Sequence, residues 1–363
     1  MPRIGAQSLQ HFVSDIFTAA GCPAEEGARV GKYLVRANLT GHDSHGVQRV
    51  PRYIERLQAG EVKIDQRVEV VIDLPALAVV DGKFGIGQTV APQSVAIGIE
   101  KCKVGGLAAI MLRNAGHIGR VGDWAEMAAA AGLVNINFVN ANGSILVAPF
   151  GGVERRFSTA PMCIGIPRAG RDPLILDFAT SQVAEGKVLN ASYGGKKLPD
   201  TAMIGPDGAI NGDPHELYGD YQGAGPRNYR NGKGAIRAFG DHKGSGLALM
   251  CELLGGALTG NGATSFAERP MSNGMLSFYV DPAKVDPKHF FGGEIDRYTD
   301  FVKSARPTAP GGEILLPGEP EARMRDERGK NGIPLPEDTW AAILATARKV
   351  GIDGRRIQQV EVM

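Results

Sequence analysis

Apolar residues recur at helical spacing through the first 58 residues of the chain. One stripe covers residues 30–39 and another covers residues 47–57, and each predicts an amphipathic helix. The segment between them, residues 41–46, reads Gly-His-Asp-Ser-His-Gly and interrupts the apolar pattern. Pro51 fits the first turn of the second helix, where a proline removes no hydrogen bond. The chain is therefore expected to open with helices joined at a polar junction.

From about residue 68 the pattern changes to strands and shorter helices. Residues 68–72 and 76–81 predict a strand pair, with Leu74-Pro75 at the turn. Further apolar runs at residues 163–167 and 174–177 precede a predicted helix at 183–188. Between the strand pair and the apolar run at 163–167, the pattern predicts helix 88–103, strand 108–112, helix 121–131 and strand 134–139, in that order. This alternation indicates an α/β sheet region.

Three later segments complete the pattern. Residues 192–235 are rich in Gly, Pro, Asn and Tyr and predict a long irregular excursion, of a length that is usually functional or forms an interface arm. Residues 244–258 predict a strongly apolar helix, and residues 336–350 predict a final amphipathic helix.

Composition narrows the class of protein. A chain of 363 residues is expected to hold two or three domains. Its net charge is +1 with both signs interspersed, so it lacks the basic stripe that a nucleic-acid partner requires. No apolar run reaches the length of a membrane span, and the first residues lack the apolar stretch of a secretory signal. The four scattered cysteines predict free thiols, and with them a cytoplasmic location.

The first candidate for chemistry is the junction at residues 42–49. On a helix, His45 and Arg49 would share one face, because they are four residues apart. Such a pair suits a 2-oxo acid, since the guanidinium can hold the carboxylate and the imidazole can protonate the carbonyl oxygen. The alternative is a purely structural junction in which Asp43 or Ser44 caps the second helix. A metal held by His42 and His45 is not expected, because no third ligand is near.

The second candidate is the Gly-rich segment 114–122, between a predicted strand and a predicted helix. Such a turn presents backbone N–H groups and the positive end of the helix dipole, which suits a phosphate, and His117 would lie at its mouth. An ordinary tight turn remains the alternative. The Rossmann fingerprint is absent, because Val90 stands where the third glycine would follow Gly85-Ile86-Gly87.

Three further polar segments have the composition of cofactor contacts, although each could equally be a helix cap or a solvated loop. They are residues 177–181 with Gly186-Lys187, residues 240–246 with Lys243, and residues 315–319.

In this order and spacing the segments resemble the type-2 malate/L-lactate dehydrogenase family, over about residues 8–355. The motifs at residues 147–150 and 314–319 are most similar to its hydroxycarboxylate dehydrogenase B branch. The matching residues are Asp43-Ser44-His45-Gly46 with Arg49 and Pro51, Gly116-His117-Ile118-Gly119, Ala148-Pro149 with Gly151-Gly152, Asp177-Phe178-Ala179-Thr180-Ser181, His242-Lys243-Gly244, and Leu316-Pro317-Gly318-Glu319.

The resemblance implies an α/β (α+β) fold whose nucleotide domain is a largely antiparallel or mixed, non-Rossmann sheet. It implies a helical domain built from both chain ends, residues 1–66 with about 300–363, and an α/β cofactor- and substrate-binding region at 67–299. It also implies a homodimer with sites at the subunit boundary. The expected reaction is hydride transfer between NAD or NADP, without a metal, and C2 of a small 2-oxo or 2-hydroxy acid such as malate or lactate.

By position, the resemblance makes His45 the proton donor with Ser44 orienting it, or else His117. Arg49 and Thr159 would bind the substrate. Cofactor contacts would come from His45, Gly119, Arg120, Val121, Asp177, Phe178, Ala179, Lys243, Leu316, Pro317 and Gly318.

Two departures from the family pattern bear on the substrate. Ala160 replaces the usual asparagine of a Gly-Thr-Asn-Pro motif, so one amide contact is lost. Lys187 stands where the imine-reducing branch has an aspartate, which argues against reduction of piperideine or pyrroline carboxylates. Cyclic imino acid reductases and ureidoglycolate- or sulfolactate-type dehydrogenases remain the alternatives.

Overall fold

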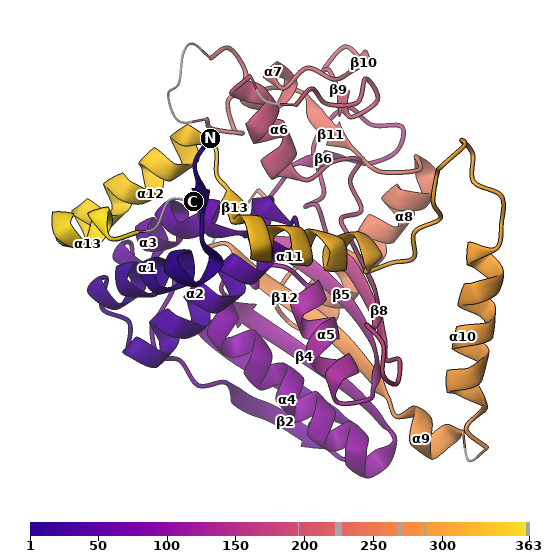
Figure 1. Cartoon of the computed structure of the whole chain (residues 1–363). Helices are drawn as coiled ribbons and strands as arrows, with labels where there is room; N and C mark the ends of the chain where they lie inside the picture. Colours follow the sequence, from indigo (N-terminus) through magenta and orange to yellow (C-terminus); the bar gives the residue numbers. More distant parts are fainter. Residues whose placement is uncertain (195, 222–226, 267–269, 287, 361–363) are drawn as a thin grey trace.

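A computed structural model describes the chain except for residues 195, 222–226, 267–269, 287 and 361–363. Its centre is a seven-stranded sheet with the order β2-β3-β4-β12-β5-β7-β8 (Figure 1). Within it, only β3 and β4 pair in parallel. The strands are β2 (Glu69–Leu74), β3 (Leu77–Gly85), β4 (Leu107–Ala115), β5 (Val134–Asn142), β7 (Met162–Ile166), β8 (Leu174–Phe178) and β12 (Ser272–Val280). The chain thus has a mixed α/β fold, and the predicted strand pair is confirmed as the β2–β3 hairpin.

Helices cover both faces of this sheet. The helices α4 (Gly87–Gly105) and α5 (Gly122–Ala130) lie on one face, where the Tyr279 ring packs on Gly98. On the other face lies a π-helical turn, Glu252–Leu258, that continues α8 (His242–Cys251). Gly274 permits this approach, because a Cβ there would lie 2.0 Å from the carbonyl oxygen of Gly255. The predicted helix at 244–258 is therefore present, with its second half wound more loosely.

The two ends of the chain share one hydrophobic cluster. Strand β1 (Arg3–Ile4) pairs antiparallel with β13 (Ile333–Pro334), and residues of the first helices pack against those of the last. The helices of this unit are α1 (Ala6–Ala19), α2 (Ala24–Leu39), α3 (Val50–Gln58), α11 (Glu319–Asn331), α12 (Glu337–Lys349) and α13 (Gly354–Gln358). Pro51 lies in the first turn of α3, as predicted.

The segment 192–235 is irregular over most of its described residues, as predicted, but it also contains short strands and a short helix. It contributes to a second sheet of order β10-β9-β11-β6 with its own hydrophobic cluster, here called the upper lobe (Figure 1). The guanidinium of Arg155 ties this lobe together by donating to five backbone carbonyls. The lobe contains β6 (Val147–Ala148), α6 (Glu185–Ser192), β9 (Met203–Ile204), β10 (Ile210–Asn211), α7 (His215–Tyr218) and β11 (Ala235–Arg237).

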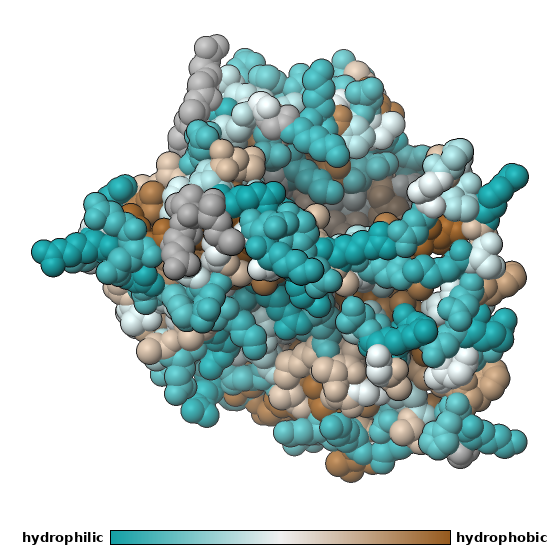
Figure 2. All heavy atoms as spheres, in the orientation of Figure 1, coloured by the Kyte–Doolittle hydropathy of each residue, from teal (hydrophilic) through white to brown (hydrophobic). Residues whose placement is uncertain are grey.

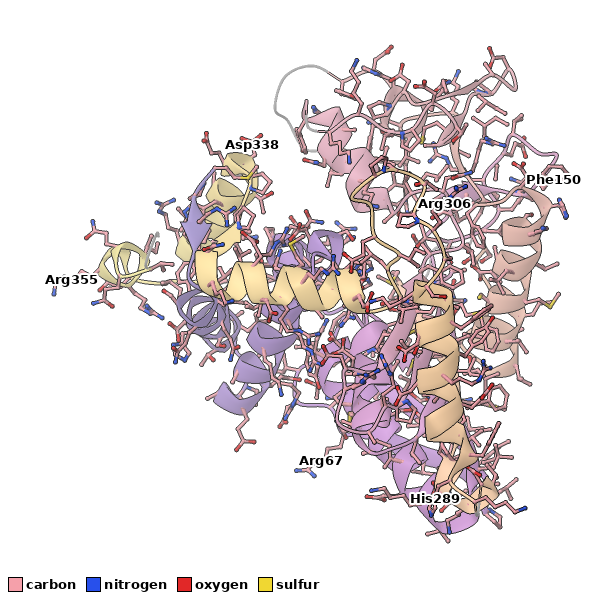
Figure 3. All side chains as sticks on the ribbon, turned by 45° about the vertical axis from the view of Figure 1, so that its right-hand side comes forward. Arg67, Phe150, His289, Arg306, Asp338 and Arg355 are labelled. Carbon is pink, nitrogen blue, oxygen red and sulfur yellow. The ribbon has the colours of Figure 1, made fainter. Side chains whose placement is uncertain are left out.

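One helix stands apart from these units. α10 (Phe290–Lys303) follows the short helix α9 (Pro282–Val285), and only Thr299 of α10 is buried. Figure 3 shows it at the edge of the molecule, with His289 at one end and Arg306 beyond the other. Phe290, Tyr298 and Phe301 are exposed on it. The surface is hollowed between the upper lobe and the units below it (Figure 2).

Candidate active site

The fold brings the two histidines of the predicted site together. His45 ends a 3-10 turn that follows α2, and His117 lies in the loop between β4 and α5. Their rings are stacked, with centroids 5.6 Å apart and planes inclined by 8°. Two segments more than 70 residues apart in the sequence therefore face one another across one site.

Each imidazole is held by its Nδ1 atom. Ser44 Oγ lies 3.0 Å from His45 Nδ1, and the Tyr53 hydroxyl lies 2.5 Å from His117 Nδ1. Gln88 Nε2 donates to the same hydroxyl at 3.1 Å. Neither Nε2 atom has a hydrogen-bond partner in the described part of the chain, and neither is sealed from solvent. Both rings thus present the nitrogen that acid–base chemistry needs.

Arg49 lies beside His45, but the backbone between them does not have the helical conformation that was expected. Gly46 is extended, so His45 and Arg49 lie on separate 3-10 turns and not on one helix. No side chain fits at Gly46, because a Cβ there would lie 2.2 Å from Asn38 Oδ1. Arg49 Nε donates to the Ser44 carbonyl oxygen at 2.6 Å, which holds the guanidinium beside His45.

The terminal nitrogens of Arg49 are left available. Within the described residues, neither Nη atom makes a hydrogen bond, and the nearest carboxylate is that of Glu185, 3.7 Å from Nη2. A guanidinium with its outer edge free and its Nε fixed can bind a carboxylate with two hydrogen bonds.

The site disfavours protonated histidine. Burial, and next the positive charge of Arg49, lower the pKa of His45 to about 3. The same two causes lower the pKa of His117 well below its usual range. Both imidazoles are therefore neutral near pH 7. An anion bound to Arg49 would offset part of this effect and raise both pKa values.

The other residues of the junction are structural. Asp43 caps no helix; it accepts hydrogen bonds from Asn38 Nδ2 at 2.6 Å and from both Nη atoms of Arg328 in α11. His42 pairs with Glu321, also in α11. The alternative in which Asp43 caps the second helix is therefore wrong, and the junction is held by α11. Among the described residues, no group of His, Cys, Asp or Glu could hold a metal ion.

The glycine-rich turn has the features of an anion site. Among the described residues, the backbone N–H groups of Gly119, Arg120 and Val121 find no acceptor, and α5 begins at the next residue. Consecutive free N–H groups at a helix N-terminus form a site for phosphate or another anion. The glycines also serve packing, because a Cβ at Gly87 would lie 2.2 Å from the His117 carbonyl oxygen.

The Arg120 side chain points into a buried ion-pair network. Its Nη1 donates to Asp123 at 3.1 Å and to Glu126 at 2.9 Å, and Arg36 pairs with the same two carboxylates. Its Nε and Nη2 atoms are buried without a partner. In this conformation the backbone N–H of Arg120, and not its side chain, is therefore the group left free to bind a ligand.

Residues 177–181 lie at the end of β8, next to this turn. Asp177 Oδ2 accepts the N–H of Gly122 at 2.7 Å, so it caps α5, an element more than 50 residues earlier. Phe178 packs edge-on against Phe239. The Thr180 hydroxyl donates to the Ala160 carbonyl oxygen and not to the next helix, whose N-cap is Ala184. A cap is thus present, although from a residue and to a helix that the sequence did not indicate.

The remaining predicted contacts are more dispersed. Lys243 is exposed in the first turn of α8 and makes no ion pair within the described residues. Leu316, Pro317 and Gly318 form the turn that starts α11 and line a cavity of about 380 Å³ together with Arg168 and Lys303. Pro317 accepts the N–H of Ile175 in β8, which places this turn on the same strand as Asp177.

The residues on either side of Thr159 are held in place by the surrounding structure. Ser158 is buried and its hydroxyl donates to Glu252 at 2.7 Å, while Ala160 Cα takes a positive φ of 25°. The Thr159 carbonyl oxygen accepts the N–H of Thr180. The loop that carries Thr159 is therefore fixed from both sides.

Four residues of the site escaped the sequence analysis: Tyr53, Gln88, Glu185 and Tyr218. Tyr53 follows two residues after Pro51, and Glu185 precedes the Gly186-Lys187 pair, so both lie beside motifs that were recognised. Lys187 itself is exposed, and it is Gly186 that contacts Ser44; a Cβ there would lie 2.6 Å from Ser44 Cβ. None of the helices in the described ranges is long and apolar enough to cross a membrane.

The chain is similar over nearly its whole length to known dehydrogenases. The family model described as malate/L-lactate dehydrogenase matches residues 4–344. Hydroxycarboxylate dehydrogenase B of Escherichia coli is 36% identical over 98% of this chain and 96% of its own. Malate dehydrogenase of Pyrococcus horikoshii is 32% identical over 97% and 96%. A solved malate/lactate dehydrogenase structure from E. coli superposes with a TM-score of 0.91 at 36% identity, covering 99% of both chains. The chain therefore belongs to the malate/L-lactate dehydrogenase family.

Proposed function

We propose that this 2-hydroxyacid dehydrogenase carries out its chemistry between His45, His117 and Arg49, on a small 2-oxo or 2-hydroxy acid and with NAD or NADP. The observation that carries the proposal is the arrangement of free groups. Two imidazoles anchored at Nδ1 and a guanidinium anchored at Nε all leave their outer nitrogens open to one site.

Each group has a distinct role in this proposal. Arg49 binds the substrate carboxylate through its Nη atoms, with Thr159 as a second substrate contact. His45, oriented by Ser44, gives a proton to the carbonyl oxygen in reduction and takes it from the hydroxyl in oxidation. His117, oriented by Tyr53, is the alternative donor. Because the bound carboxylate offsets the charge of Arg49, the pKa of the donor rises when substrate is present.

The chain also has the groups to hold a dinucleotide. The free N–H groups of Gly119, Arg120 and Val121 fit a phosphate. Asp177 fixes the start of α5, which positions these N–H groups. Bound next to this site, the nicotinamide supplies or accepts the hydride. Further contacts are assigned to His45, Phe178, Ala179, Lys243 and the turn Leu316-Pro317-Gly318.

We also propose a homodimer. The helix α10 stands away from the body and exposes Phe290, Tyr298 and Phe301, while α8 exposes Leu249 and Met250. A second copy that covered these side chains would remove apolar surface from water, which stabilises association. The four cysteines are buried free thiols, which supports a cytoplasmic location.

A spectrophotometric panel tests the proposed function. The panel offers four substrates, each with NADH and with NADPH: pyruvate, oxaloacetate, phenylpyruvate and a cyclic imino acid. Oxidation of the reduced cofactor is followed by the absorbance of its nicotinamide ring. Turnover of a 2-oxo acid is expected. Turnover of the cyclic imine alone would replace this function by imine reduction, and no turnover with either cofactor would refute it.

A further inference from the structure

Glu185, the first residue of α6, faces the substrate clamp. Its Oε2 lies 3.7 Å from Arg49 Nη2, and the two side chains are only 19% and 26% exposed. Among the described residues, Glu185 is the only carboxylate that pairs with Arg49. The guanidinium is therefore neutralised in part before any substrate arrives.

The carboxylate of Glu185 is held in place from two sides. The Tyr218 hydroxyl donates to Oε1 at 2.6 Å, and Tyr218 is 1% exposed in the core of the upper lobe. On the other side, Gly186 brings the start of α6 into contact with Ser44. The pKa of the Tyr218 hydroxyl is raised by burial and next by the negative charge of Glu185. The upper lobe thus positions a charge beside the clamp.

We infer that Glu185 is a specificity-determining residue that favours 2-oxo acids with one carboxylate over those with two. The inference rests on the proposed function, since it assumes that Arg49 binds the substrate carboxylate. Arg49 and Glu185 cancel in charge, and both imidazoles are neutral. A monocarboxylate leaves this group with one net negative charge, whereas a dicarboxylate leaves it with two.

The geometry also lets a substrate carboxylate bind Arg49 without breaking a hydrogen bond to Glu185. A separation of 3.7 Å is beyond hydrogen-bond length, so the Nη atoms of Arg49 remain free to bind an incoming carboxylate. Glu185 then stays nearby, anchored by Tyr218, where it repels a second carboxylate. Lys187 does not compensate, because its side chain is exposed to solvent, which screens its charge.

The test compares two substrates of similar shape and different charge. In 4-methyl-2-oxopentanoate, two methyl groups stand where oxaloacetate has two carboxylate oxygens. The wild-type protein is expected to show the lower KM for 4-methyl-2-oxopentanoate. In Glu185→Gln, the KM for oxaloacetate should fall about tenfold relative to the KM for 4-methyl-2-oxopentanoate. This is the effect of removing one like charge from a partly solvated site. The value of kcat should change little for either acid.

Two further variants separate charge from structure. Tyr218→Phe removes the anchor but leaves the charge, so it should keep most of the wild-type discrimination. Glu100→Gln makes the same chemical change at an exposed position on α4 and should leave both KM values unaltered. An unchanged KM ratio in Glu185→Gln, or a wild-type preference for oxaloacetate, would overturn the inference while leaving the proposed function intact. Absence of turnover with both acids would count against the proposed function itself.

Discussion

Replacing Arg49 by glutamine removes the clamp and leaves the fold. Within the described part of the chain the Arg49 side chain makes one hydrogen bond, from Nε to the Ser44 carbonyl oxygen, so the loss of stability should be about 1 kcal/mol. That is small against the roughly 5–15 kcal/mol that keeps a domain folded. The variant should therefore be folded and testable.

The effect on catalysis should be much larger. Truncating one partner of a buried, hydrogen-bonded charge pair costs about 2–5 kcal/mol of binding free energy. The lower half of that range applies here, because solvent reaches part of the guanidinium. A loss of about 2–3 kcal/mol corresponds to a fall in kcat/KM of about 30- to 150-fold. Most of this loss in kcat/KM should come from a higher KM, because Arg49 binds the carboxylate in the ground state as well as in the transition state.

Steady-state kinetics with the best 2-oxo acid of the panel measures this loss. Arg52→Gln is the matched control, since Arg52 lies one turn away, is 59% exposed and, among the described residues, pairs with Glu55 alone. The control should keep wild-type kinetics. If Arg49→Gln stayed within threefold of the wild-type kcat/KM, with an unchanged thermal unfolding midpoint, the assignment of Arg49 as the carboxylate clamp would be wrong.

Three other outcomes are expected. Gly186→Ala should lower stability by about 1–3 kcal/mol and reduce kcat, because a Cβ would lie 2.6 Å from Ser44 Cβ; an unaltered unfolding midpoint would contradict this. Tyr53→Phe should lower kcat more than it raises KM if His117 takes part in proton transfer. Kinetics equal to those of the wild type would exclude a role of His117 in that step. The third concerns acid stability. His45 has a pKa of about 3 in the folded chain and 6.5 in the unfolded chain, so the unfolded chain binds more protons in between. Stability should thus fall as the pH drops below 6.5, with His45 alone contributing up to about 1.4 kcal/mol per unit and His117 adding to the fall, and His45→Gln should reduce that slope in urea unfolding.

Local patterns in the sequence predicted the parts of the fold that depend on near neighbours. The β2–β3 hairpin, the helices α4 and α5 and the position of Pro51 in α3 all follow from apolar spacing and turn residues within a few positions. The motif around His45 and the turn around His117 were recognised for the same reason, because each lies within one short segment.

Contacts between distant segments could not be predicted in this way. Strand β12 forms the middle of the sheet, yet Ser272 to Val280 carries no alternation, since β4 and β5 flank it and both faces are covered. Asp43 looked like a helix cap because its true partner, Arg328, is 285 residues away. Glu185 lies at the site because Gly186 packs on Ser44, a contact between segments far apart in the sequence.

The central claim is that His45, His117 and Arg49 surround the reacting carbon of the substrate. A crystal structure with a bound nicotinamide dinucleotide and oxamate, an unreactive analogue of pyruvate, tests it most directly. The account predicts the oxamate carboxylate on the Nη atoms of Arg49, with its amide carbonyl oxygen within hydrogen-bond distance of Nε2 of His45 or His117. Oxamate bound with neither imidazole in reach of that oxygen, or held by a cation other than Arg49, would contradict it.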